Sequence, residues 1–180
     1  MSTKLLHRAV AVMAALIAIP GSTAISAPDS GYVPGLGEFM AAMQMHHAKL
    51  WFAGEAGNWP LAAYELDEVE EGFGDIVKFH PVHEGSPVPI KEILPELTAA
   101  PVDRLRAAIG SRDGARFEAA FDALTAACNA CHREENFYFN VIKRPGTNPY
   151  TNQDFSPSPP PADERARRGK MNPAPGATSH

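Results

Sequence analysis

The stretch Cys128-Asn129-Ala130-Cys131-His132 constrains this 180-residue chain most, because it contains the only two cysteines. Residues three and four apart lie on one face of an α-helix, so on a helix both thiols and the imidazole point the same way. Two cysteines at this spacing, followed directly by histidine, are the attachment signature of a c-type haem. We therefore expect one covalently attached haem c. Cys128 and Cys131 would form the thioethers, and His132 would be the proximal iron ligand.

Three other interpretations of the two cysteines are a redox disulfide, half of a zinc site, and a chance occurrence of the haem motif. A thioredoxin-like motif opens a helix, whereas helix-forming sequence from Ala115 to Ala127 runs into Cys128. A zinc site needs a second pair of cysteine or histidine ligands, and there is no other cysteine. Haem attachment is the best interpretation.

Residues 1–27 have the pattern of a secretory signal peptide. Lys4 and Arg8 precede the apolar run Ala9–Ile19, and small residues follow it. The run is shorter than the roughly 20 apolar residues that span a bilayer, and no later segment reaches that length. An uncleaved anchor or a buried helix is the alternative. We expect export to the periplasm and no membrane span after signal removal.

The net charge of the chain limits which class of partner it is expected to bind. The formal net charge is −5, and removing the predicted signal takes away two basic residues and no acidic ones. A negative domain disfavours nucleic acid as a partner and suits a basic redox protein of the periplasm. Residues 28–155 have the length of one domain, a haem-binding helical bundle with a C-terminal extension. Residues 156–180, mostly Pro, Ser, Ala and charge, should be disordered.

Hydrophobic periodicity predicts an all-α fold, a four-helix bundle with up-down-up-down connections and an irregular C-terminal tail. Asn58 is a plausible N-cap for the second helix. Pro95 and Pro101 should divide the third helix into two pieces. The predicted helices cover residues 36–53, 59–77, 90–97 with 101–109, and 115–136.

Three further features have a simple interpretation and a more specific one. The acidic residues of the second helix form a solvated face, or a docking patch for a positive partner. His80 and His83 lie in a Pro/Gly-rich loop and are plain loop residues, or metal ligands. The apolar residues from Phe137 to Ile142 fold back over the bundle, or belong to a mobile arm.

Four predicted helices with Cys128-x-x-Cys131-His132 on the last one resemble the cytochrome c prime class, periplasmic four-helix bundles with one haem c. The likeness covers residues 36–136, and its only specific motif is Cys128 to His132. It implies haem attachment at both cysteines, proximal ligation by His132 and pairing as a homodimer. This chain departs from the class in continuing for 48 residues after His132.

The sixth iron ligand would decide the chemistry. In such a bundle the fourth helix runs antiparallel to the first, so the iron should face the first turns of that helix. Met40 and Met43 lie there, and His47 lies further along. Geometry therefore ranks Met40 or Met43 ahead of His47 as the distal ligand. An open or apolar distal side is the alternative, because inward-facing methionines usually just fill space.

Three functions follow from these alternatives. A methionine ligand would make the protein an electron carrier. A five-coordinate iron in an apolar pocket would bind NO or CO. A peroxidase-type enzyme would need an open iron and a distal acid-base group, for which His47 is the candidate. The electron carrier is the preferred hypothesis and an enzyme is the least favoured.

Overall fold

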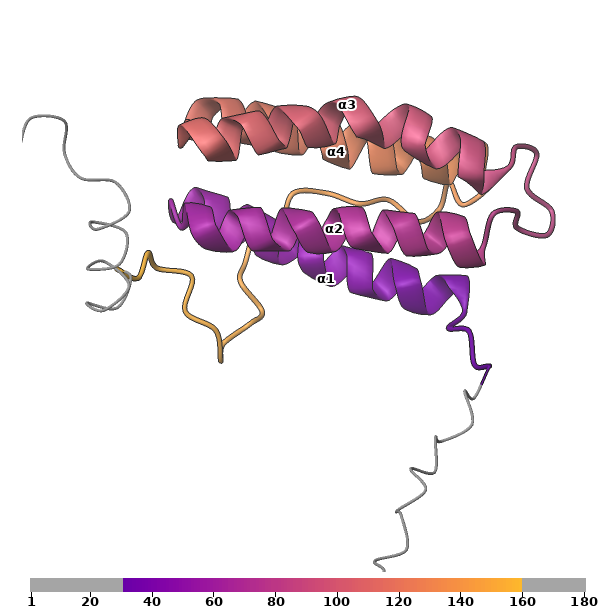
Figure 1. The fold of residues 1–180 in the computed structure, drawn as a ribbon, viewed down its shortest axis with the longest axis horizontal. Coiled ribbons are helices and arrows are strands. Elements are labelled where there is room, and N and C mark those ends of the chain that lie inside the picture. The colour runs from indigo at the N-terminus through magenta and orange to yellow at the C-terminus, as the bar shows by residue number, and fades with distance from the viewer. Residues whose placement is uncertain (1–30, 160–180) are drawn as a thin grey trace, which may run out of the picture. The chain divides into compact units, whose positions relative to one another are not determined.

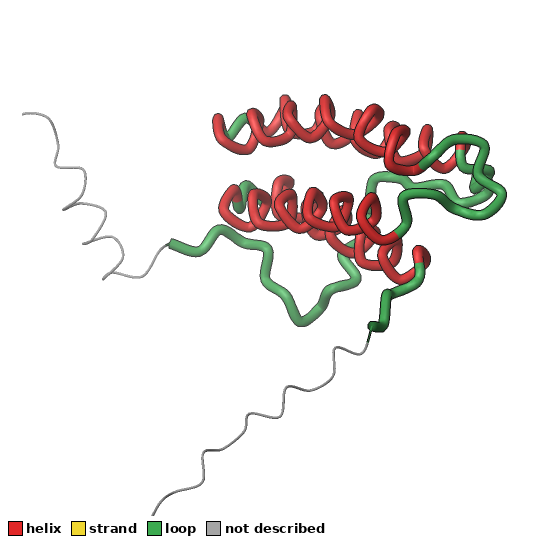
Figure 2. The backbone as a smooth tube through the Cα atoms, turned by 45° about the vertical axis from the view of Figure 1, so that its right-hand side comes forward, coloured by secondary structure: helices red, strands yellow, loops and turns green. Residues whose placement is uncertain are grey.

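The computed structural model describes residues 31–159, and these contain four α-helices and no strand. The helices are packed as neighbours in chain order, and the fourth returns to the first (Figure 1). Loops join them at their ends (Figure 2). The predicted all-α four-helix bundle is confirmed. The helix bounds are Leu36–Glu55 for α1, Trp59–Phe79 for α2, Ile90–Ser111 for α3 and Gly114–Glu134 for α4.

Two predicted segments fall wholly or mainly beyond this part of the chain. The signal peptide of residues 1–27 lies outside the described residues, as do residues 160–180 of the predicted disordered tail. Within residues 31–159, no helix combines the length and the apolar composition that crossing a membrane requires.

Side-chain caps fix where two of the helices begin. Asn58 Oδ1 accepts the Leu61 backbone N–H at 3.3 Å, which confirms the predicted cap of α2. Asp113 Oδ1 accepts the Arg116 N–H at 3.0 Å and starts α4 in the same way. Gly57, with φ +72°, reverses the chain between α1 and α2. Short turns of this kind place consecutive helices antiparallel.

The predicted division of the third helix is wrong. α3 is one continuous helix with Pro95 and Pro101 inside it. An internal proline removes a backbone hydrogen bond and costs about 3 kcal/mol or more. The buried face of α3 includes Pro101 and continues past the exposed Pro95, and packing of such a face supplies most helix stability in proteins. Buried along it are Ile90, Leu94, Thr98, Pro101, Val102, Leu105, Ala108 and Ile109.

The two ends of the bundle are filled differently. At one end, Trp51, Phe117 and Phe121 pack with ring centroids 5.0–6.3 Å apart. Phe117 lies so close to Gly54 of α1 that a Cβ there would overlap its ring. Towards the other end, a smaller cluster surrounds a cavity and includes Cys131. Its buried members are Ile76, Ile90, Leu94 and Cys131.

The chain after α4 is irregular and runs back along the bundle (Figure 1). We call residues 137–159 the C-terminal arm. Arg144 binds Asp122 and Glu118 of α4, and its guanidinium lies 4.4 Å from the Trp51 ring centroid. Phe155 then packs against Phe52 of α1 and is only 7% exposed. The chain after α4 therefore follows the bundle, but the predicted covering by the apolar residues 137–142 is only partial, because Tyr138, Phe139 and Val141 are 70–72% exposed.

Candidate functional site

A cavity of about 520 Å³ lies beside the Cys-x-x-Cys-His stretch, within the size range of small-molecule and cofactor sites. All four helices, the α2–α3 loop and the C-terminal arm contribute to its wall. Every residue that the sequence singled out as a haem or iron ligand lines it. The lining residues are Leu36, Gly37, Met40, Ala41, Met43, Gln44, His47, Phe73, His83, Ile90, Leu94, Cys128, Cys131, His132, Glu135, Phe137, Asn140 and Ile142.

Cys128 and Cys131 are free thiols one turn apart near the end of α4. Burial raises the pKa of the Cys128 thiol to about 12, with a smaller contribution from Cys131. Burial also raises the pKa of Cys131 to about 11, helped by Glu135 and Glu134. Reactive redox cysteines instead have lowered thiol pKa values. The surroundings of both thiols therefore disfavour a reactive redox pair.

His132 is oriented by a backbone group of the C-terminal arm. Its Nδ1 lies 2.7 Å from the Asn140 carbonyl oxygen. A carbonyl only accepts hydrogen bonds, so Nδ1 carries the proton and donates it. In the neutral ring, Nε2 then keeps its lone pair. Histidines that bind a metal through one nitrogen typically donate the other N–H to a carbonyl or carboxylate in this way.

The end of α4 explains how Asn140 reaches His132. Asn136 adopts the left-handed conformation, with φ +64°. The Phe137 N–H donates to the His132 carbonyl at 2.6 Å, and the Asn136 N–H donates to the Arg133 carbonyl at 3.2 Å. These two bonds form a Schellman motif, which stops a helix and turns the chain back. The helix therefore ends at Glu134, two residues before the predicted end.

Met40 and Met43 line the cavity from α1, but their surroundings differ. The Met43 thioether packs over Gly72 of α2, where an added Cβ would overlap its Sδ and Cε atoms. The absence of a side chain at Gly72 therefore makes room for Met43. Both methionines also pack against the smaller apolar cluster.

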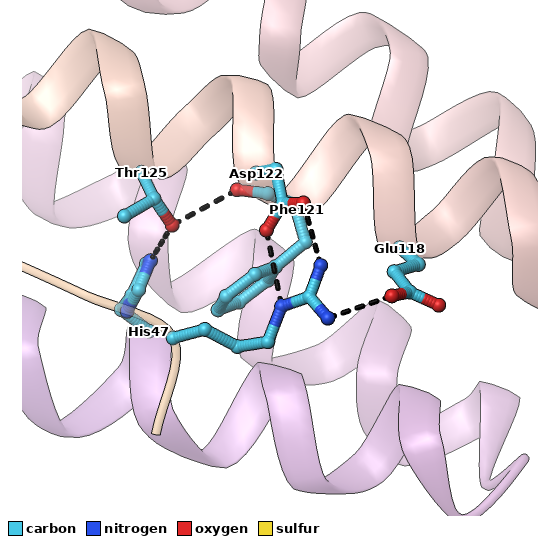
Figure 3. Close-up of polar contacts among 6 residues, drawn as sticks. His47, Glu118, Phe121, Asp122 and Thr125 are labelled. Carbon is cyan, nitrogen blue, oxygen red and sulfur yellow. Dashed lines mark hydrogen bonds and ion pairs between the residues drawn. The ribbon is translucent and has the colours of Figure 1, made fainter. Parts of the chain in front are cut away.

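His47 is buried, and its imidazole points to Thr125 of α4 (Figure 3). Thr125 donates its hydroxyl to the Phe121 carbonyl at 3.0 Å and accepts from His47 Nε2 at 2.8 Å. Thr125 precedes His132 by seven residues, roughly 10 Å along a helix. Burial lowers the pKa of His47 to about 4. His47 is thus a weak base, and its Nε2 is already bonded.

Glu135 and His83 also line the cavity, although neither was predicted to belong to this site. Glu135 is 6% exposed, and both of its carboxylate oxygens are buried without a hydrogen-bond partner. Burial raises the pKa of Glu135, while His83 acts in the opposite direction. Glu135 follows Cys131 by four residues, a spacing that puts both on one face of a helix. Nothing in the sequence placed the loop residue His83 beside it.

The loop histidines are separated by their contacts. His83 stacks on Phe137 with ring centroids 5.4 Å apart, whereas His80 Nε2 donates to the Pro34 carbonyl at 2.8 Å. Among residues 31–159, no group of three or more His, Cys, Asp or Glu side chains is arranged to hold a metal ion. The contacts favour the interpretation of both as loop residues.

The chemistry of the cavity fits a covalently attached haem. Two thiols one turn apart and an oriented imidazole open onto a space whose wall is mainly apolar. Glu135 adds a buried carboxylate that could bond a donor inside the cavity. Comparison with models of known protein families, with curated proteins and with solved structures gives no match for this chain.

Proposed function

We propose that this chain is an exported electron carrier of the cytochrome c prime type with one c-type haem. Cys128 and Cys131 would hold the haem through thioethers, and His132 Nε2 would bind the iron. The observation that carries the proposal is the 2.7 Å bond from His132 Nδ1 to the Asn140 carbonyl, because it leaves Nε2 as a ligand beside two free thiols.

When bound, the haem would supply an iron that accepts and releases one electron. The chain's own part is to position that iron and to control access of water to it. Leu36, Ile90 and Leu94 give the wall an apolar surface, and burial of the site is one of the properties that set a haem potential. His132 is oriented by the arm, which would hold the ligand in one orientation when the haem is bound.

Met40 is the better candidate for the sixth ligand. Both methionines line the cavity from α1, which faces α4 across it. The thioether of Met43 is packed over Gly72, and His47 Nε2 is bonded to Thr125. Met40 makes neither of these two contacts. Ligation by methionine and histidine raises the reduction potential and suits electron transfer.

Binding of NO or CO is a second candidate function. The packing of Met43 over Gly72 and the bond from His47 to Thr125 favour this function, because they give both residues a partner other than the iron. If Met40 also served only to fill space, the sixth position would open onto an apolar wall. Small neutral ligands would bind there. The peroxidase alternative is weaker, since the lowered pKa of His47 makes it a poor proton acceptor.

The first experiment is absorption spectroscopy of the exported protein, oxidised and reduced, with and without CO. We expect a covalently bound haem with a low-spin spectrum that CO does not change. Replacing Met40 by Leu should give a high-spin spectrum that shifts with CO, because leucine keeps the volume but cannot bind iron. Met43→Leu is the matched control and should leave the spectrum unchanged.

Other outcomes would discriminate the alternatives. A high-spin, CO-sensitive spectrum in the unmodified protein would reject the electron carrier and support gas binding. A change in Met43→Leu alone would assign the ligand to Met43. Protein without covalent haem would reject both functions.

The partner proposed for this carrier is a basic redox protein of the periplasm. The net charge of −5 favours such a partner through long-range attraction. The acidic side of α2 is partly neutralised, because Arg106 of α3 pairs with Asp67 at 3.0 Å and also with Glu70. The overall charge is therefore a better guide to the partner than this face alone. The homodimer implied by the resemblance stays a prediction.

A further inference from the structure

Asn129, the first residue between the two cysteines, makes a pair of hydrogen bonds to the C-terminal arm. Its Nδ2 donates to the Ile142 carbonyl at 2.7 Å, and its Oδ1 accepts the Ile142 N–H at 2.7 Å. The amide side chain thus satisfies both backbone groups of one arm residue. Such a two-point contact fixes the arm's position along α4 as well as its distance from the helix.

The residue held in this way lies two positions after Asn140, whose carbonyl accepts the proton of His132 Nδ1. Asn129 and His132 are three residues apart, so both contact the arm from one side of α4. The arm is held again at Arg144, which binds Asp122 and Glu118, about two and three turns before Asn129 in the helix. Residues 140–144 therefore lie against α4 with bonds near both ends.

We propose that Asn129 is a positioning residue for the iron ligand: it holds residues 140–142 so that the Asn140 carbonyl orients His132. The inference rests on the proposed function, because it concerns the histidine that would bind the iron. It gives a role to one of the two residues that the Cys-x-x-Cys spacing leaves unspecified. It also explains why the chain continues closely along α4 after the motif.

The hydrogen bond at Nδ1 changes the ligand as well as its orientation. A carbonyl that accepts the Nδ1 proton makes the imidazole a stronger electron donor at Nε2. A stronger donor stabilises the ferric ion more than the ferrous ion. Loss of the Asn129 contact should therefore loosen the Asn140 carbonyl, weaken the donor and raise the reduction potential.

The test is a redox titration of the purified holoprotein, with the electron paramagnetic resonance spectrum of the ferric form as a second readout. Asn129→Ala removes both bonds to Ile142, and Asn129→Leu removes them with little change of volume. We expect both variants to shift the ferric/ferrous equilibrium three- to tenfold towards ferrous, the upper value being about 59 mV for one electron. Their resonance spectra should change because the imidazole is reoriented.

Asn148→Ala is the matched control, because it removes a side-chain amide of the same arm that accepts the Tyr150 N–H and does not line the cavity. It should leave the potential and the spectrum unchanged. If Asn129→Ala and Asn129→Leu shift the potential equally, the shift is due to the lost hydrogen bonds. A void cannot be the cause, since only the alanine variant leaves one. Asn129→Leu serves alone if Asn129→Ala does not fold.

Two results would overturn the inference in distinguishable ways. If the unmodified protein contains covalent haem and folded Asn129 variants keep its potential and spectrum, Asn129 has no positioning role, although the haem assignment stands. If the unmodified protein carries no covalent haem, the proposed function fails and the inference fails with it.

Discussion

Two adjacent histidines of α1 point to different neighbours, and their contacts differ accordingly. His46 faces α2, where its Nδ1 lies 2.8 Å from Oε2 of Glu65, a carboxylate only 1% exposed. A buried carboxylate requires such a partner. His47 points instead into the cavity and bonds Thr125 of α4. One imidazole contacts a buried carboxyl group of α2, whereas burial disfavours the charged form of the other.

The buried His47 should make stability depend on pH. Its pKa is about 4 in the folded protein against an ordinary 6.5, so between these values the unfolded chain binds more protons. The free energy of unfolding should therefore fall as the pH decreases from 6.5 to 4, by up to about 3 kcal/mol. Urea unfolding of the wild type and of His47→Gln across this range measures the effect.

Glutamine is the informative substitution because it retains an N–H donor for Thr125 but does not titrate. His47→Gln should lose less stability than the wild type between pH 6.5 and 4. The two proteins should keep a constant difference above pH 7. Parallel curves over the whole range would show that His47 does not cause the acid sensitivity.

At the scale of helices, the sequence predicted the elements well where local signals and packing agree. The Asn58 cap and the periodic apolar face determine α2 almost completely. α3 was divided in error because Pro95 and Pro101 are strong local signals, while the buried face that overrides them comes from packing with other helices. The same limit applies to Gly54, whose importance depends on Phe117, a residue 63 positions later.

Gly54 and Gly74 provide a direct test of helix packing. A Cβ at Gly54 would overlap the ring of Phe117, so Gly54→Ala should destabilise the protein by about 1–3 kcal/mol. Gly74 has open space around its Cβ position, and Gly74→Ala should stabilise α2 by about 0.5–1 kcal/mol. Urea unfolding followed by circular dichroism measures both. A similar effect of the two substitutions would contradict the close approach of α1 and α4.

At the scale of the whole described chain, the C-terminal arm links the site to the bundle. The sequence predicted the cysteines, His132 and the methionines as one site, because helical spacing and antiparallel packing bring them together. It did not predict the Asn140 carbonyl or the Asn129 contact. Both are bonds to irregular backbone, which leaves no periodic pattern in a sequence. The buried Glu135 carboxylate has no hydrogen-bond partner, and this depends on the elements packed around it, so the sequence alone does not predict it.

The C-terminal arm contributes a buried side chain to the folded core. Phe155 is 7% exposed and packs between Phe52 of α1 and Tyr150, with ring centroids 5.7 and 6.4 Å away. Phe155→Ala should lower the free energy of unfolding by about 3 kcal/mol, as for other buried phenylalanines. Phe139 is 72% exposed, and Phe139→Ala should change stability by less than about 0.5 kcal/mol.

Thermal and urea unfolding of both variants measure the difference, and equal effects would contradict a packed arm. The haem spectrum of Phe155→Ala adds a second comparison. His132 is oriented by residues near the start of the arm, which Asn129 and Arg144 hold independently of Phe155. Phe155→Ala should therefore reduce stability while leaving the spectrum of the folded protein unchanged. A spectral change would show instead that the whole arm moves as one unit with the iron ligand.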